Sequence, residues 1–141
     1  MKEDCIFCNI ANGTFSSETI YEDEHVRAVL DIHPIAPGHT MILPKIHCET
    51  ILDVADSEIL NIFTALKKVT KILKECLNPD GFTIGINHGK CAGQAVDHLH
   101  IHIIPRWKND GGNSIHSVVQ NSPSESLTEI KNRIINNKHG N

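Results

Sequence analysis

The segment His98-Leu99-His100-Ile101-His102-Ile103-Ile104 carries the most regular pattern in this chain. Histidines alternate with aliphatic residues along it, which is typical of a strand with one polar face and one apolar face. Because successive side chains of a strand point to opposite faces, we expect the three histidines to share one face. Their spacing would be about 6.6 Å, two rises of roughly 3.3 Å, so three imidazoles could surround one small ligand.

Three interpretations of these histidines are open on chemical grounds. They could simply form the polar face of a half-buried strand. His-x-His on a strand is also a natural pair of metal ligands. A neutral imidazole, with an ordinary pKa of about 6.5 and a free lone pair, can also attack phosphorus at neutral pH. Neighbouring imidazoles would then stabilise the negative charge on the phosphoryl oxygens.

The remaining strands are predicted from short apolar runs bounded by turn residues. Residues 19–21 and 25–32 are expected to form a hairpin around the polar Glu22-Asp23-Glu24 turn. An apolar strand is expected over residues 39–43, ending at Pro44, and another over residues 82–87. With a strand over residues 97–104, the chain would carry five.

Three helices are expected to accompany these strands. Apolar residues recur at three- and four-residue steps through residues 57–77, with Asp56 as the expected N-cap. A short helix is expected over residues 5–12, and Ser122-Pro123 is expected to begin a C-terminal helix. Several strands with one long helix between them predict an α+β domain with an antiparallel sheet.

Length and composition limit the classes of function. The chain has 141 residues, enough for one domain, and its formal net charge of −4 provides no basic surface for nucleic acid. The first ten residues, MKEDCIFCNI, include no long apolar run, so we expect neither a signal peptide nor a membrane span. Five cysteines, an odd number, favour reduced thiols and a cytoplasmic location. We therefore expect no nucleic-acid partner and no membrane partner.

The histidine segment resembles the signature of the histidine triad superfamily of nucleotide hydrolases and transferases. Further matches precede it: Asp31-Ile32-His33-Pro34-x-Ala36-Pro37-Gly38-His39, then Pro44-Lys45-x-His47, Asn87 and Gly93-Gln94. The resemblance covers residues 5 to about 107 and implies a five-stranded antiparallel sheet. It also implies a homodimer in which two sheets become continuous, with residues 57–77 and 82–87 at the interface. We assign residues 1–110 to this domain and residues 111–141 to an extension whose helix packs on the same domain.

The resemblance also implies catalytic roles. His100 would attack the α-phosphorus of a purine nucleotide substrate and form a covalent nucleotidyl-histidine that water resolves. A main-chain carbonyl would hold the other ring nitrogen of His100 as N–H. His39 and His102 would donate hydrogen bonds to phosphate oxygens, and Asn87 would contact the phosphate or the bridging atom.

The same resemblance implies a nucleotide-binding set. Asp31 would bind the ribose hydroxyls, the region of Gln94 and Ala95 would lie beside the phosphate, and an apolar slot would hold the base. That slot would comprise Ile6, Phe7, Ile10 and Leu30. These four could equally belong to the core, Asp31 could be a turn residue, and Gln94 could be ordinary loop polarity. Ala95 stands where Hint-like members carry Ser or Thr, whereas Pro105-Arg106 is more like Fhit-like members, so the branch stays open.

Cys5-x-x-Cys8 is a further candidate site. Two thiols at this spacing could pack in a core or form a redox pair. The resemblance implies a structural zinc ion held by Cys5, Cys8, His47 and His98. Two thiolates and two imidazoles suit tetrahedral Zn²⁺ with no open position.

Taken together, the resemblance predicts an enzyme that acts on nucleoside phosphoramidates or dinucleoside polyphosphates and releases a nucleoside monophosphate. The alternative is a nucleotide sensor or partner-binding module.

Overall fold

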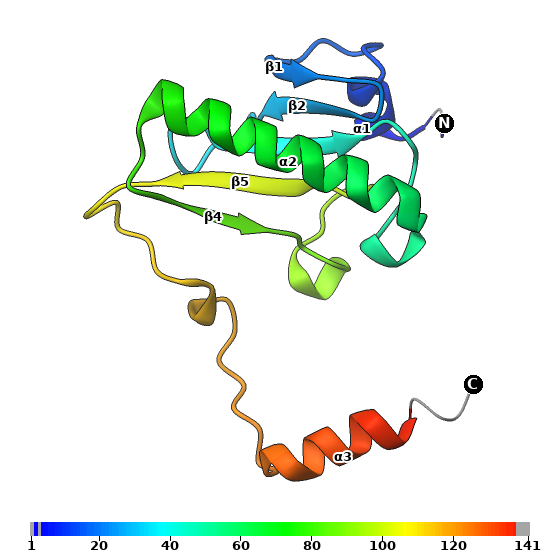
Figure 1. The fold of residues 1–141 in the computed structure, drawn as a ribbon, viewed down its shortest axis with the longest axis vertical. Coiled ribbons are helices and arrows are strands. Elements are labelled where there is room, and N and C mark those ends of the chain that lie inside the picture. Colours follow the sequence, from blue (N-terminus) through cyan, green and yellow to red (C-terminus); the bar gives the residue numbers. More distant parts are fainter. Residues whose placement is uncertain (1, 3, 138–141) are drawn as a thin grey trace.

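Five strands form one antiparallel sheet in the order β1-β2-β3-β5-β4 in a computed structural model that describes residues 2 and 4–137 (Figure 1). The strands are β1 Thr19–Glu22, β2 Val26–Leu30, β3 Thr40–Pro44, β4 Gly81–Gly85 and β5 Ile101–Arg106. The sheet and its antiparallel pairing confirm the predicted α+β class. The order leaves β1 and β4 as edge strands and places β5, with its histidines, between β3 and β4.

The main core lies between the sheet and α2, the helix Asp56–Leu77, which runs across one face (Figure 1). Ile62, Val69 and Leu73 recur along α2 at helical spacing and are buried. They pack against inward-facing residues of the strands, among them Ile42, Ile101 and Ile103. This alternation leaves the opposite side of β5 to His102, Ile104 and Arg106.

A second, smaller core lies on that opposite face. The short helix α1, Ile6–Ala11, packs there against β2 and β3. Ala11 and three strand residues are buried in it, and Phe7 and Ile10 pack against them: Val29, Met41 and Leu43 are the strand residues. The helix therefore covers the β2–β3 part of the face and leaves the β5–β4 part open.

Several predicted boundaries differ from the structure; β4, for example, spans residues 81–85 instead of 82–87, so Asn87 lies beyond the strand. β5 begins at Ile101, so His98 and His100 lie in the segment that leads into the strand, because β3 pairs with β5 only from Ile101 onward. Asp56 is the first residue of α2 and does not cap it; Ala55 is the N-cap and makes no side-chain hydrogen bond. Asp56 instead lies in the first turn of α2, where its negative charge interacts favourably with the helix dipole.

After β5 the chain forms an extended arm that ends in α3, Leu127–Asn137 (Figure 1). α3 has no buried residue and stands apart from the sheet, so the expected packing of this helix on its own domain is not observed. The helix also starts later than expected: Ser126 and Glu129 form the hydrogen bonds of a capping box. Residues 138–141 of the predicted extension lie outside the described residues. Among the helices that the structure describes, none has the length and apolar character needed to cross a membrane.

Candidate active site

His100 is held in one tautomer by a main-chain contact. Its Nδ1 lies 2.8 Å from the carbonyl oxygen of His98, so Nδ1 carries the proton and donates. The other ring nitrogen, Nε2, therefore keeps its lone pair. The ring is 6% exposed and contacts the edge of Phe7 on α1, with 5.1 Å between ring centroids. This arrangement fixes an unprotonated ring nitrogen in a defined place.

His102, His39 and Asp31 form a second group next to His100. His39 Nε2 and His102 Nδ1 are hydrogen-bonded at 2.9 Å, and Asp31 Oδ2 lies 3.7 Å and 3.9 Å from these same atoms. Burial lowers the pKa of His102 from its ordinary 6.5 to about 4; His100 and His39 act in the same direction, and Asp31 opposes them. Burial also lowers the pKa of His39. Both rings are thus neutral at physiological pH.

The Pro-rich turn before β3 positions His39. Gly38 has φ +77°, and a Cβ there would lie 2.3 Å from the Leu77 side chain at the end of α2. Only glycine fits this left-handed and crowded position. Asp31 and His39 are joined across the turn by a main-chain hydrogen bond of 2.9 Å. The turn therefore sets the ring of His39 and the carboxylate of Asp31 on the same side of the sheet.

The side chain of Gln94 is engaged by the main chain of the surrounding loops. Its side chain is buried, and its amide bonds only to main-chain atoms: Oε1 accepts from Gly89, and Nε2 donates to the carbonyls of Glu49 and Val96. These contacts order the loop before the histidines and leave its amide without a free group for a phosphate. Ala95 is exposed, and Asn87 lines a cavity together with His102.

The expected base-binding residues are only partly brought together. Leu30 and Asp31 line a hollow of about 440 Å³ with the turn that leads to His39. Phe7 and Ile10 pack against the small core under α1, while Ile6 is half exposed. An apolar slot for the base beside Leu30 stays a prediction.

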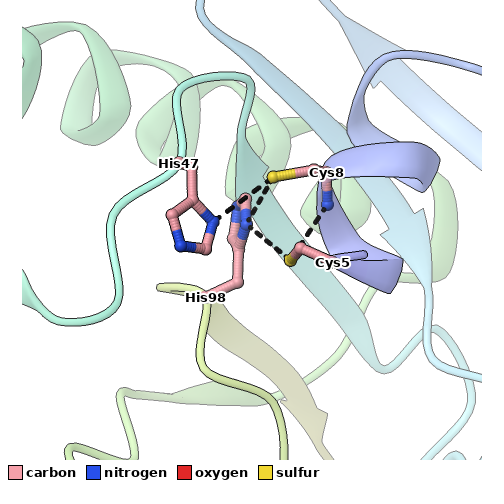
Figure 2. A group of neighbouring side chains, drawn as sticks. All are labelled: Cys5, Cys8, His47 and His98. Carbon is pink, nitrogen blue, oxygen red and sulfur yellow. Dashed lines mark hydrogen bonds between the residues drawn. The ribbon is translucent and has the colours of Figure 1, made fainter. Parts of the chain in front are cut away.

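Cys5, Cys8, His47 and His98 converge at the start of α1, as Figure 2 shows, and their ligand atoms all lie within 4.8 Å of one another. The Sγ atoms of Cys5 and Cys8 lie 3.5 Å from His98 Nδ1, and Cys8 Sγ lies 3.3 Å from His47 Nδ1. Tetrahedral zinc, with Zn–S near 2.3 Å and Zn–N near 2.0 Å, places S and N roughly 3.5 Å apart. The four residues therefore fit a zinc ion in both donor chemistry and spacing.

The far side of the His98 ring supports the same assignment. His98 Nε2 donates to the carbonyl of Pro44 at 3.0 Å, which leaves Nδ1 unprotonated and facing the two sulfurs. Burial lowers the pKa of His98 to about 4, an effect that His47 and His100 increase and the Pro44 hydrogen bond opposes. A neutral ring with its second nitrogen held by a carbonyl is the usual state of a metal-ligating histidine.

Two features of this site have no clear signal in the sequence. One is the approach of Asp31 to His39 and His102, which depends on how the turn folds back. The other is the arm after β5, whose residues 112–115, 117 and 118 line the cavity beside His102. Sequence motifs predict neither feature, because the position of Asp31 depends on tertiary contacts and the arm has no recognisable motif.

The chain is thus a small α+β domain with histidines clustered at the start of β5, an interior strand of its sheet. Residues 12–109 match the family model of the HIT domain, and the chain belongs to the HIT, or histidine triad, family. An uncharacterised HIT-like protein of Methanocaldococcus jannaschii is 45% identical over 90% of this chain and 98% of its own length.

Relatives with named activities and solved structures extend this result. An adenosine 5′-monophosphoramidase of Candida albicans is 39% identical over 72% of this chain and 70% of its own. A HIT-family structure from Bacillus subtilis has a TM-score of 0.83 at 34% identity and covers 96% of this chain and 95% of its own. A zinc-bound histidine triad protein from Mycobacterium smegmatis has a TM-score of 0.72 at 31% identity, covering 87% and 85%. The family thus includes hydrolases of nucleotide derivatives, and the fold is shared across nearly the whole chain.

Proposed function

We propose that this protein hydrolyses derivatives of a purine nucleoside monophosphate at the α-phosphorus, with His100 as the nucleophile. The observation that carries the proposal is the tautomer of His100: the His98 carbonyl fixes the proton on Nδ1, so Nε2 is free to attack. The Candida relative, a monophosphoramidase, supports the reaction class. Substrates would be nucleoside phosphoramidates or dinucleoside polyphosphates.

The reaction has two steps. His100 Nε2 forms a bond to the α-phosphorus while the P–N or P–O bond to the leaving group breaks. An amine leaving group takes up one proton from solvent, and one proton returns to solvent when water is split in the second step. Water then attacks the nucleotidyl-histidine, the P–N bond to His100 breaks, and the nucleoside monophosphate is released. One water molecule is consumed, and the neutral ring of His100 is regenerated.

Neighbouring residues would stabilise the charge that develops on phosphorus. His39 and His102 are neutral and share one hydrogen bond, which uses one of their two ring N–H groups. A phosphate oxygen that enters the site would accept a hydrogen bond from the other ring N–H. Asn87 would contact the phosphate or the bridging atom from the loop that follows β4. Asp31 would bind the ribose hydroxyls, a role compatible with its place beside the hollow at Leu30.

We also propose that Cys5, Cys8, His47 and His98 bind a structural zinc ion. The fit of the four ligand atoms supports it, and a related protein from M. smegmatis is zinc-bound. Four protein ligands leave no open coordination position, so the ion would activate no water. It would tie α1 to the segment that carries His98 and His100.

The assembly proposed is a homodimer in the cytoplasm. The outer edge of β4 has no strand partner among the described residues, and Phe63 and Leu77 on α2 are exposed apolar residues, which suits edge-to-edge pairing with helices in contact. Cys76 and Cys91 are exposed thiols, which favour a reducing compartment.

A turnover assay tests the proposal and separates it from a nucleotide-sensing role. Wild-type protein is incubated with an AMP–amine phosphoramidate or a diadenosine polyphosphate, and AMP is followed by chromatography. His100→Ala should lower turnover roughly a thousandfold or more, since the covalent route is lost. His25→Ala, a matched change in the turn between β1 and β2, should leave turnover unchanged. Binding of nucleotide without any release of AMP would favour the sensor instead.

A further inference from the structure

The thiols of Cys5 and Cys8 are placed to react with each other as well as to bind zinc. Cys8 lies in the first turn of α1, and its main-chain N–H donates to Cys5 Sγ at 3.4 Å. The two side chains face the same point beside His98, as Figure 2 shows. Two cysteines at this spacing within one helical turn are the usual arrangement of a redox-active Cys-x-x-Cys pair.

The two thiols differ in their access to solvent. Cys5 is 7% exposed, whereas Cys8 and His98 are 0% exposed, so a small oxidant meets Cys5 first. The Sγ atom of Cys8 lies behind it, within 4.8 Å of Cys5 Sγ. Cys48, which is also buried, instead directs its Sγ to the carbonyl of Ile46 at 4.0 Å. Cys5 is therefore placed to react with the oxidant, and Cys8 is placed to react next with Cys5.

A disulfide between these cysteines is incompatible with the zinc site. Zinc, when bound, keeps both sulfurs as thiolates, which is the form of cysteine that peroxides oxidise. A Cys5–Cys8 disulfide removes two of the four ligands and both negative charges, and it leaves only the neutral imidazoles of His47 and His98. Structural zinc sites have four protein ligands, so the two imidazoles would not retain the ion.

We propose that Cys5 and Cys8 are a redox-reversible thiol pair, which a peroxide oxidises to a disulfide with release of the zinc ion. The inference rests on the zinc site of the proposed function. Cys5 Sγ bonds to one peroxide oxygen as the O–O bond breaks, and a sulfenic acid and, with one proton, a water molecule form. Cys8 Sγ then bonds to the sulfur of Cys5, and the hydroxyl group leaves with a second proton as water. Two electrons pass from the two thiolates to the peroxide.

Oxidation would loosen α1 from the segment that leads into β5. This segment carries the carbonyl of His98, which lies 2.8 Å from His100 Nδ1, and Phe7 on α1 contacts the ring of His100. The main-chain contact does not depend on the metal, so turnover should fall only to the level of the Cys5→Ser, Cys8→Ser variant. The larger effects should be loss of zinc and a lower Tm.

Treatment of the zinc-loaded full chain with hydrogen peroxide tests the proposal. Cys76→Ser and Cys91→Ser are introduced first, because these two exposed cysteines would otherwise consume oxidant. Released zinc is measured with a chromogenic chelator, and disulfides are mapped by mass spectrometry of peptides prepared without reductant. We expect about one zinc per chain to be released in parallel with formation of the Cys5–Cys8 disulfide. A dithiol reductant and added zinc should restore the metal content and the Tm.

Cys5→Asp in the same background provides the matched control. Aspartate is a good N-cap and offers a carboxylate oxygen to zinc, but it cannot form a disulfide. The variant should retain zinc and release it at least about tenfold more slowly on addition of peroxide. Cys5→His, which offers an imidazole, should behave in the same way and provides a second variant with a different side chain. Release from both variants as fast as from the parent would overturn the proposal.

Three further results with the parent protein would overturn it. They are retention of zinc while peroxide is consumed, release of zinc with Cys5 and Cys8 still reduced, and a disulfide that includes Cys48. If the purified protein binds no zinc, the zinc site itself is wrong, and the absence of a Cys5–Cys8 disulfide after peroxide would also reject the thiol pair. None of these measurements requires hydrolysis of a nucleotide, so their outcome is independent of the role proposed for His100.

Discussion

His98 takes part in two different interactions through two parts of the same residue. Its ring faces Cys5 and Cys8, while its main-chain carbonyl accepts the proton of His100 Nδ1. The convergence of the cysteines with His47 and His98 could be expected from a family resemblance. The sequence could not show which carbonyl holds His100, because that depends on a bend in the chain just before β5 begins. The roles of these residues in catalysis stay predictions.

The free energy of unfolding should decrease as the pH is lowered, and His102 should contribute to this decrease. Burial lowers its pKa in the folded state to about 4, with His100 and His39 adding to the effect and Asp31 opposing it. The unfolded chain therefore binds a proton near pH 6.5 that the folded chain does not bind, and folding is disfavoured progressively as pH falls from about 6.5 to about 4.

Thermal melts between pH 7 and pH 4 measure this effect. His102→Gln should have a smaller decrease in Tm over this interval than the wild type, because the residue that binds the extra proton is gone. His116→Gln, a change at an exposed position of the arm, serves as the control and should follow the wild-type curve. Parallel curves for His102→Gln and the wild type would show that His102 is not a source of the pH dependence.

At the scale of elements, the alternation in the histidine segment and the short apolar runs elsewhere predict the five strands, and apolar residues at three- and four-residue steps predict α2. These patterns fail at the ends of these elements, where tertiary contacts decide. β5 starts later than the alternation suggests because β3 offers it no partner before Ile101. α3 starts at Leu127 because Ser126 and Glu129 supply a better cap than the Ser122-Pro123 pair.

The helix α1 should depend on zinc for its attachment to the sheet. Cys5 is the N-cap of α1, and its Sγ accepts the main-chain N–H of Cys8. Serine is a good N-cap, so Cys5→Ser with Cys8→Ser keeps this cap while it removes two thiolate ligands. We expect the wild type to contain about one zinc per chain and this variant to contain none, with a lower Tm and only modestly lower turnover.

Elemental analysis and thermal melts check this prediction. Cys76→Ser with Cys91→Ser changes two exposed cysteines and should retain both zinc and Tm. The absence of zinc from wild-type protein prepared without chelator would contradict the proposed zinc site. If the Cys5→Ser and Cys8→Ser variant is folded but has turnover as low as His100→Ala, the metal has a catalytic role.

For the whole molecule, the position of the arm is the feature that differs from the expectation. Leu127 and Ile134 on α3 are exposed in the single chain, although their helical spacing led us to expect a helix packed on its own domain. Helical periodicity reveals an apolar face but cannot tell which surface covers it. Likewise, the sequence does not show which surface covers the exposed apolar residues of α2 and the outer edge of β4 at the proposed dimer interface.

Light scattering at micromolar concentration tests the homodimer. We expect twice the 15.6 kDa of one chain. Phe63→Glu on α2 should lower the mass toward that of one chain, whereas Phe15→Glu should not; the two phenylalanines are 45% and 47% exposed and differ in location. A wild-type mass near 15.6 kDa would contradict the dimer.

The central claim is that His100 becomes covalently nucleotidylated, and a direct search for that adduct tests it most sharply. Wild-type protein is mixed with an AMP–amine phosphoramidate and denatured within the first turnovers at alkaline pH, which preserves the P–N bond, and its peptides are mapped by mass spectrometry. The account predicts a nucleotidyl group on His100 that decays as AMP appears, and none in His100→Ala. Turnover without any adduct on His100, or with the adduct on another histidine, would contradict it.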